Sequence, residues 1–184
     1  MGNWQLDPYH TQVEFAAKHL GMMTVRGYFD DVSTVANIDP EHPETSSVEA
    51  TISVGSLRTN NAMRDKDILS SNFLEVDKYP LITFKSTGVQ AAGPDSYTLT
   101  GDLTIKGNTR PVSLNVVNLG EFNDPNMGHR IGYSAEGQIN RKDFGMQFEM
   151  MLDGKFIVSN EIKINIEGEL IEAKESETAG SASS

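Results

Sequence analysis

The strongest constraint on the fold of this chain is a repeated two-residue alternation of apolar and polar side chains. Eight segments between Val13 and Leu170 place apolar residues at every second position, and turn-forming residues separate most of them. Because successive side chains of a strand point to opposite faces, each segment has one apolar face and one polar face. Many such strands in sequence remove their exposed edges by closing into a barrel or by stacking as a sandwich. The pattern therefore predicts an all-β protein.

Glycines inside the predicted strands favour a barrel over a flat sandwich, which stays open as the alternative. A glycine weakens a strand locally, but it permits the sharp coiling that closure of a barrel demands. Four such positions occur, at Gly27, Gly101, Gly137 and Gly168. We therefore expect an antiparallel barrel of eight strands, whose interior is either filled with side chains or holds one small ligand.

Four interruptions of the alternation indicate where the chain turns. The phase slips at Asp30-Asp31, which predicts a bulge or bend. Residues 60–73 lack the alternation and predict a short helix, with Asn60 or Asn61 as its N-cap. Gly107-Asn108 is expected to form a two-residue hairpin turn with glycine first, and residues 121–129 a loop.

Length and composition indicate one domain without cysteine chemistry. The chain has 184 residues, of which 1–172 are expected to form the barrel and 173–184 a disordered acidic, serine-rich tail. There is no cysteine, so a disulfide framework and a thiolate site are excluded.

Charge and hydropathy limit the partners. The formal net charge of -11 argues against nucleic acid and against docking on anionic lipid through a basic patch. No apolar stretch approaches the ~20 residues that span a bilayer, so no stable membrane insertion is expected. The N-terminus lacks the features of a signal peptide, which predicts a cytoplasmic protein, or a periplasmic one if a signal peptide has been removed.

The apolar faces of the strands could line a cavity, or they could pack against each other as an ordinary core. A tunnel of aromatic and branched side chains can hold an apolar tail without exact polar geometry, since each buried methylene stabilises by ~0.8 kcal/mol. The residues that we expect in such a wall are Phe15, Ala17, His19, Phe29, Ile52, Leu69, Phe73, Phe84, Leu99, Leu103, Leu114, Tyr133, Phe144, Met146, Ile164 and Ile166.

Three side chains are candidates for contact with a polar head group. His19 is in phase with the apolar face of its strand and could donate to a carbonyl or diphosphate oxygen. Arg64 and Arg141 lie in irregular segments, and a guanidinium suits phosphate oxygens. The alternatives are structural: a buried or rim histidine, and ion pairs of Arg64 with Asp65 or Asp67 and of Arg141 with Asp143.

The remaining residues with chemical potential give weaker signals. Five methionines lie in two non-strand segments and predict either a mouth or lid of the cavity or a plug at one end: Met22, Met23, Met146, Met150 and Met151. Four scattered histidines without cysteine do not favour a metal site. No nucleophile elbow, phosphate loop or dinucleotide fingerprint is present, so neither a cofactor nor a catalytic residue is expected.

A set of motifs along the chain resembles the YceI-like family of bacterial lipid-binding proteins. The resemblance covers nearly everything except the tail, and it is carried by the order and spacing of residues 4–15 with His19, Gly27-Tyr28-Phe29, residues 64–71 with Phe73, Tyr79-Pro80, Phe84, residues 101–112, residues 141–146 and residues 159–164. One departure is Asp67, where the family often has histidine, and it bears on the head-group preference.

The resemblance implies a lipocalin-like antiparallel barrel with a long internal cavity that binds polyisoprenoid chains, such as prenyl diphosphates and quinone tails. We therefore expect non-catalytic binding, storage or transport of an isoprenoid lipid, and a homodimer is plausible. Two alternatives remain open at this point. One is an enzyme that acts on such a lipid, for which only His19 and Tyr133 are plausible catalytic groups, and the other is a filled barrel that serves as a structural or interaction module.

Overall fold

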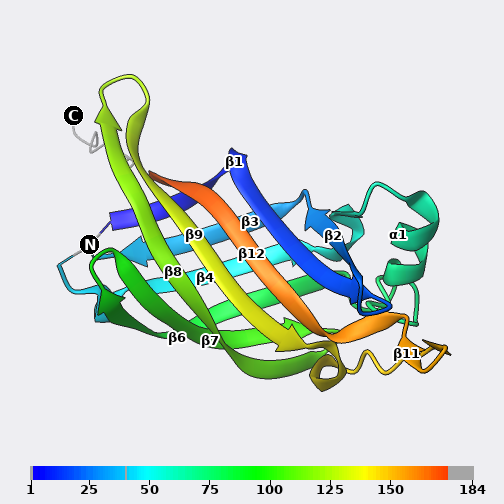
Figure 1. The fold of residues 1–184 in the computed structure, drawn as a ribbon. Coiled ribbons are helices and arrows are strands. Elements are labelled where there is room, and N and C mark those ends of the chain that lie inside the picture. The colour runs from blue at the N-terminus through cyan, green and yellow to red at the C-terminus, as the bar shows by residue number, and fades with distance from the viewer. Residues whose placement is uncertain (1, 40, 174–184) are drawn as a thin grey trace, which may run out of the picture.

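The computed structural model describes residues 2–39 and 41–173, which are mostly β-strand (Figure 1). The strands are β1 (Gly2–His19), β2 (Met23–Phe29), β3 (Val32–Ile38), β4 (Ser47–Ser53), β5 (Leu57–Arg58), β6 (Leu81–Gly93), β7 (Ser96–Ile105), β8 (Asn108–Asp124), β9 (Gly128–Asn140), β10 (Met151–Leu152), β11 (Lys155–Phe156) and β12 (Val158–Glu172). The helices are α1 (Ala62–Leu69) and the 3-10 turns η1 (Pro43–Thr45), η2 (Val54–Ser56) and η3 (Arg141–Phe144).

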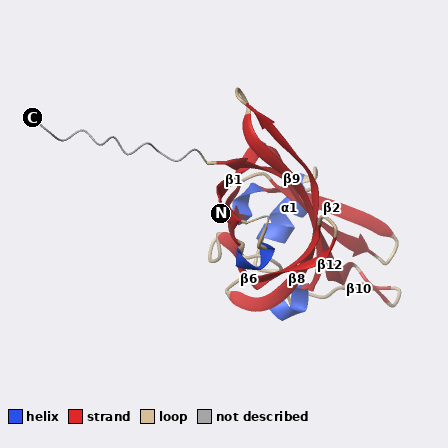
Figure 2. Ribbon diagram, turned by 90° about the vertical axis from the view of Figure 1, so that its left-hand side faces the viewer, coloured by secondary structure: helices blue, strands red, loops and turns tan. Residues whose placement is uncertain are grey.

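The sheet closes on itself as an antiparallel barrel, as predicted. Neighbouring strands follow the order β12-β9-β8-β7-β6-β4-β3-β1, and β12 also pairs with β1 to complete the ring (Figure 2). The second half of β1 pairs with β2 and its first half pairs with β3, so β2 and β3 together act as one bent strand. Eight strands therefore surround the axis, while β5 extends β2 and β10–β11 form a separate small hairpin.

The bend between β2 and β3 falls at Asp30-Asp31, where the phase of the alternation slips. The glycines inside strands do more than permit coiling, because two of them make room for a ring on the neighbouring strand. A methyl group on Gly27 would overlap the Phe15 ring, and one on Gly101 would overlap the Phe84 ring. Both aromatic rings thus lie against a glycine in the adjacent strand.

The first strand is much longer than the alternation from Val13 predicts. β1 begins at Gly2, but its pairing with β12 shifts register between Leu6 and Thr11. Within that irregularity, the Asp7 carboxylate accepts a hydrogen bond from the Tyr9 backbone N–H. The local turn resets the phase, so the two halves of β1 do not read as one alternating run.

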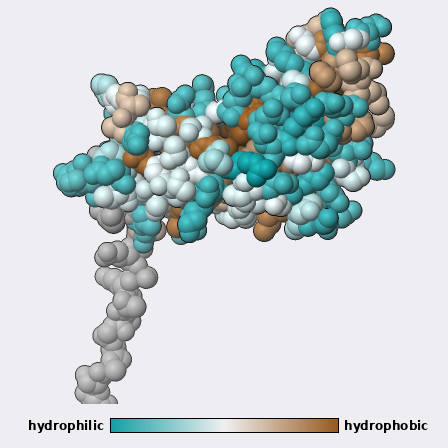
Figure 3. Space-filling view, turned by 90° about the horizontal axis from the view of Figure 1, so that it is seen from below, coloured by the Kyte–Doolittle hydropathy of each residue, from teal (hydrophilic) through white to brown (hydrophobic). Residues whose placement is uncertain are grey.

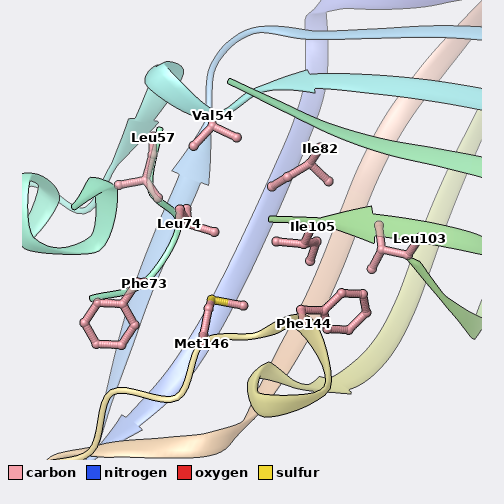
Figure 4. Close-up of a cluster of buried hydrophobic side chains, with 9 residues drawn as sticks. All are labelled: Val54, Leu57, Phe73, Leu74, Ile82, Leu103, Ile105, Phe144 and Met146. Atoms are coloured by element: carbon pink, nitrogen blue, oxygen red, sulfur yellow. The ribbon is translucent and has the colours of Figure 1, made fainter. Parts of the chain in front are cut away.

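Helix α1 confirms the short helix expected in residues 60–73 and lies at one end of the barrel (Figure 1). Asn61 is the N-cap, and its side chain accepts a hydrogen bond from the Arg64 backbone N–H. Beside α1, a cluster of buried side chains fills part of this end of the barrel (Figure 4). Its members are Val54, Leu57, Phe73, Leu74, Ile82, Leu103, Ile105, Phe144 and Met146.

Two sequence-based assignments of turns are wrong in position. The hairpin between β7 and β8 turns at Lys106-Gly107 rather than Gly107-Asn108, since Ile105 and Asn108 face each other as the last pair. Both turn residues have positive φ, 50° at Lys106 and 73° at Gly107, as in a type I′ turn. The loop expected over 121–129 is also shorter, because β8 continues to Asp124 and β9 begins at Gly128.

The chain ends of the barrel lie side by side. β12 ends at Glu172, and the backbone N–H of Ala173 donates to the carbonyl of Asn3 at 2.7 Å. The tail predicted over 173–184 lies outside the described residues from position 174 onward. In the part of the chain that the structure describes, no helix is both long and apolar enough to cross a membrane.

Candidate ligand-binding cavity

A cavity of about 1090 Å³ runs through the interior of the barrel. Its wall is formed mainly by apolar side chains that point inward from the strands, which is the consequence of the alternation in the sequence. The volume lies at the upper end of the range of roughly 300–1,000 Å³ that is typical of small-molecule sites. The barrel is therefore not filled by its own side chains.

Most of the residues predicted for the wall lie there. The wall includes Phe15, Ala17, His19, Phe29, Ile52, Phe73, Phe84, Leu99, Leu103, Leu114, Tyr133, Met146, Ile164 and Ile166. Their position in the wall is a property of the structure, whereas their contact with a ligand stays a prediction.

Leu69 and Phe144 do not belong to the wall. Phe144 is only 1% exposed and packs into the buried cluster beside α1, because the η3 turn directs it there (Figure 4). Leu69, the last residue of α1, packs against the same cluster. Both side chains stabilise one end of the barrel instead of facing the cavity.

Arg141 brings a buried positive charge to the wall of the cavity. It is 2% exposed, and its guanidinium donates to the carbonyls of Met146 at 2.6 Å and Ser159 at 3.1 Å. Its central carbon also lies 5.9 Å from the centre of the Phe73 ring. Burial lowers the pKa of Arg141, although Glu149 counteracts this.

Arg141 forms no ion pair with any carboxylate in the described residues, so the alternative of a pair with Asp143 is wrong. Glu149, the acid that influences it, pairs with Lys142. A buried cation without a counter-ion is costly, which makes this position a candidate for binding an anion.

Arg64 lines the same end of the cavity but is held by a different set of contacts. Its guanidinium donates to the hydroxyl of Thr59 at 2.8 Å and to the Thr59 carbonyl at 2.7 Å. The Asp65 carboxylate accepts from the same hydroxyl at 2.5 Å, so Thr59 stands between the two charges. Asp67 accepts a hydrogen bond from Asn72 and also reaches the cavity. Neither acid forms the direct ion pair with Arg64 that the alternative required.

The three head-group candidates converge on one end of the cavity. His19 is the last residue of β1 and pairs with Val158, which precedes Ser159, the residue whose carbonyl holds Arg141. Arg64 approaches the same end from α1. Sequence spacing could not place these residues together, because they come from β1, α1 and η3.

Tyr133 lies deeper in the cavity, and its chemistry is that of a neutral phenol. Burial raises its pKa to about 12, and the nearby Tyr97 and Glu121 raise it further. It can therefore donate or accept a hydrogen bond, but it does not ionise near neutral pH.

A charge network that the sequence did not reveal lies at the end of the barrel opposite α1. Asp7 is 3% exposed and contacts His10 at 2.9 Å and Arg130 at 2.5 Å. Arg130 also reaches Glu169 at 2.8 Å. Asp7, His10 and Glu169 together resemble a metal-binding group, but Arg130 already neutralises both acids. The irregular turn at Asp7-Pro8 was the one signal in the sequence.

An eight-stranded antiparallel barrel with a long apolar cavity and a short helix at one end defines a lipocalin-like protein. The family model of the YceI-like domain matches residues 4–170, and the chain belongs to this family.

Relatives of known sequence cover most of the chain. The UPF0312 protein of Pseudomonas paraeruginosa is 38% identical over 159 residues, which is 86% of this chain and 81% of the relative. Protein YceI of Escherichia coli is 40% identical over 141 residues, or 77% of this chain and 73% of the relative.

Solved structures agree with the fold. The YceI protein of Campylobacter jejuni has 30% identity and a TM-score of 0.75, covering 85% of this chain and 90% of its own. A polyisoprenoid-binding domain of Saccharophagus degradans has 14% identity and a TM-score of 0.65, covering 94% of this chain and 100% of its own. The second similarity is one of fold alone.

Proposed function

We propose that this protein binds an isoprenoid lipid in its barrel and stores or carries it without chemical change. The observation that carries the proposal is the continuous apolar cavity, since a closed barrel of this size would otherwise fill with its own side chains. An apolar tail gains ~0.8 kcal/mol for each methylene that it buries, which outweighs the cost of immobilising it.

The volume of the cavity suits a tail of several isoprene units. At roughly 30 Å³ for each group the size of a water molecule, about 1090 Å³ corresponds to on the order of 30 to 40 carbon-sized groups. A short fatty acid would leave much of the wall without contacts, and such gaps lose dispersion energy.

The cationic end of the cavity favours an anionic head group, such as a diphosphate. Arg141 is buried, and no carboxylate within residues 2–39 and 41–173 pairs with it, so an anion at the mouth would supply the missing negative charge. His19 and Arg64 line the same end and could donate further hydrogen bonds. In this arrangement the tail extends toward Tyr133 and the head group remains beside α1.

The protonation state of Tyr133, which faces the cavity, favours binding over catalysis. Tyr133 has its pKa raised to about 12, so it is a poor general base at neutral pH. The Saccharophagus degradans domain of similar fold is described as a polyisoprenoid-binding domain, which supports the same class of ligand here.

The direct test is to extract lipid from the protein purified from its host and identify it by mass spectrometry. We expect an isoprenoid, and we expect the emptied protein to take up prenyl diphosphates and quinones. Recovery of no apolar ligand, together with no uptake of either class, would overturn the proposal.

The role of Arg141 in binding the head group is tested by comparing two ligands that differ only in their head group. Arg141→Gln should weaken binding of a prenyl diphosphate at least about tenfold, since charged hydrogen bonds contribute ~1.5–3 kcal/mol, and leave binding of the prenyl alcohol of equal length unchanged. Arg110→Gln, at an exposed position of β8, is the control and should affect neither ligand. Equal losses for both ligands would assign Arg141 a structural role.

A further inference from the structure

An exposed apolar surface lies at the end of the barrel that carries α1. The turn between β1 and β2 contributes Met22 and Met23, and the segment around the β10–β11 hairpin contributes further exposed side chains. We call this surface the methionine rim, which consists of Met22, Met23, Met63, Met150, Met151, Leu152 and Phe156. Figure 3 shows brown and tan atoms gathered at the upper right, the end where β11 lies in Figure 1.

Backbone hydrogen bonds hold the two main parts of the methionine rim together. The N–H of Leu20, in the β1–β2 turn, donates to the carbonyl of Ile157 at 3.1 Å. The N–H of Ile157 donates in turn to the carbonyl of Met150 at 2.9 Å, and Met151 pairs with Phe156 across the hairpin. These apolar side chains therefore form one surface and are not scattered.

The methionine rim is continuous with the cavity. Met23 is 68% exposed and Met63 is 86% exposed, yet both also line the cavity wall. A residue that faces both the solvent and the cavity marks an opening. Glu121 marks one at the opposite end, and we call the opening at the methionine rim the mouth. An apolar guest that enters or leaves here passes directly from the rim into the barrel.

The charges of the molecule are distributed unevenly along the barrel axis. Close to the methionine rim lie Lys18, Arg64 and Lys155, among other basic residues, interspersed with acids. At the opposite end, the acids gather on the β3–β4 connection, the β8–β9 hairpin and the end of β12: Asp39, Glu41, Glu44, Glu121, Asp124, Glu167, Glu169 and Glu172. In the described residues of those three segments the basic side chains are all paired with acids: Arg130 with Asp7 and Glu169, His129 with Glu121 and Glu172, and His42 with Asp39.

We propose that the methionine rim docks reversibly on the surface of a phospholipid bilayer and opens the cavity toward the lipid. Exposed unbranched apolar side chains at the tip of a hairpin can enter the headgroup region without spanning the membrane. The acidic end is repelled by anionic lipid while the rim is not, so the charge distribution orients the barrel with its mouth toward the bilayer. The formal net charge of -11, which argued against lipid docking, describes the whole chain and not this end.

The purpose of such docking rests on the proposed function, since a carrier of a membrane lipid must exchange it with a bilayer. Docking itself is measured separately. Flotation with vesicles of phosphatidylcholine and a minor share of phosphatidylglycerol, free of isoprenoids, reports docking alone. Uptake of a prenyl diphosphate from detergent solution reports binding alone.

The test compares two double variants with matched exposure. Met151→Glu with Leu152→Glu places charge on the methionine rim. Leu119→Glu with Phe122→Glu places the same charge on β8, near the acidic end. All four wild-type side chains are more than half exposed. We expect the wild-type protein and the β8 variant to float with vesicles. The rim variant should lose at least about tenfold in vesicle affinity, because charged side chains replace the apolar ones that would enter the lipid, and it should keep its uptake from detergent.

Several results would overturn the inference. One is a wild-type protein that does not float, and another is a rim variant that floats as well as the control. A wild-type dimer that the rim variant converts to monomers would assign the rim to a second copy of the chain instead. Loss of isoprenoid uptake with vesicle docking intact would overturn the proposed function and leave the docking surface in place.

Discussion

Among single residues, Asp7 and Arg141 are the two buried side chains with formal charge in the described residues, and they have opposite surroundings. Asp7 receives hydrogen bonds from His10, Arg130 and the Tyr9 backbone, so its charge is balanced within the protein. Within the described part of the chain, Arg141 donates only to carbonyl oxygens. The first arrangement serves stability, while the second leaves a charge for a partner to balance.

Asp7 should make stability depend on pH in the acid range. Burial alone would raise its pKa, but the hydrogen bonds from His10, Arg130 and Tyr9 outweigh burial and lower it to about 2. Because the folded-state pKa lies below the unfolded value, the stabilisation is present above about pH 4 and is lost as the pH falls toward 2.

Asp7→Asn should therefore reduce the free energy of unfolding at neutral pH by ~1–3 kcal/mol, and the difference from wild type should shrink below about pH 4. Urea unfolding at a series of pH values measures this, with the exposed Asp102→Asn as control. A difference that stays constant down to about pH 2 would contradict the assignment.

Single residues also show where sequence reasoning succeeds and where it ends. The cap at Asn61 was predictable, because an N-cap hydrogen bond depends on residues within one turn of helix. The isolation of Arg141 was not, because Asp143 is close in sequence and the η3 turn decides whether the two side chains meet. Sequence spacing therefore does not predict contacts that depend on tertiary packing.

At the scale of elements, the β7–β8 turn shows how two local rules can compete. Glycine followed by asparagine fits a turn with glycine first, and this pattern predicts a turn at Gly107-Asn108. The structure instead pairs Ile105 with Asn108, which forces Lys106 into positive φ. The pairing of the flanking strands over their whole length sets the register, and the turn follows it.

Glycine is required at position 107 because φ is positive there and because a methyl group would meet the Tyr79 ring. The two effects can be measured separately. Gly107 and Gly154 have the same φ of 73°, but a methyl group on Gly107 would lie 2.8 Å from the Tyr79 ring, whereas at Gly154 there is no atom within 4 Å. Gly154→Ala should cost ~1–2 kcal/mol from backbone strain alone, and Gly107→Ala should cost clearly more. Thermal unfolding of both variants measures the difference, and equal costs would mean that Tyr79 moves aside freely.

His129 should link the β8–β9 hairpin to β12 in a pH-dependent manner. Its Nδ1 contacts Glu172 at 2.8 Å and its Nε2 contacts Glu121. The hydrogen bond with Glu172 raises the pKa of His129 most, burial lowers it, and Glu121 raises it further. Since the folded-state pKa exceeds the unfolded value, the stabilisation is complete below about pH 6.5 and is lost as the pH rises through the folded pKa.

His129→Gln should flatten the decline in stability above about pH 6.5. Hydrogen exchange of the β8–β9 amides, or thermal unfolding across this range, measures the effect. An unchanged slope in His129→Gln would show that the contacts with Glu172 and Glu121 do not persist in solution.

For the whole molecule, the alternation predicted which side chains face inward but not how much space they enclose. The fourteen predicted residues that lie in the wall would face inward in a filled barrel as well, and a cavity remains only because their summed volume is smaller than the space that the ring of strands encloses. Phe144 illustrates the limit, since it is apolar and close to the barrel end, yet it packs into the cluster beside α1. The local sequence pattern predicts which way each side chain points, whereas the volume of the cavity depends on how the strands close into a ring.

Filling the cavity should shorten the tail that the protein accepts. Ala17 and Ala50 line the wall, and phenylalanine at both positions would occupy part of the space with little strain. We expect Ala17→Phe with Ala50→Phe to retain shorter isoprenoids by mass spectrometry at unchanged thermal stability. Val35→Phe, on the exposed face of β3, should retain the wild-type ligand. If both variants retained isoprenoids of the same chain length, the ligand would not occupy the part of the cavity beside Ala17 and Ala50.

The pairing of β1 with β12 joins the first and last strands of the barrel. During synthesis, a ribosome must therefore complete every strand of the barrel before the first strand gains its second neighbour, and until then that strand presents unpaired amides to other nascent chains. The same adjacency brings Asn3 and Ala173 together, so a permuted gene that starts at another hairpin and tethers these two positions should still fold, with the late pairing moved to its new first and last strands.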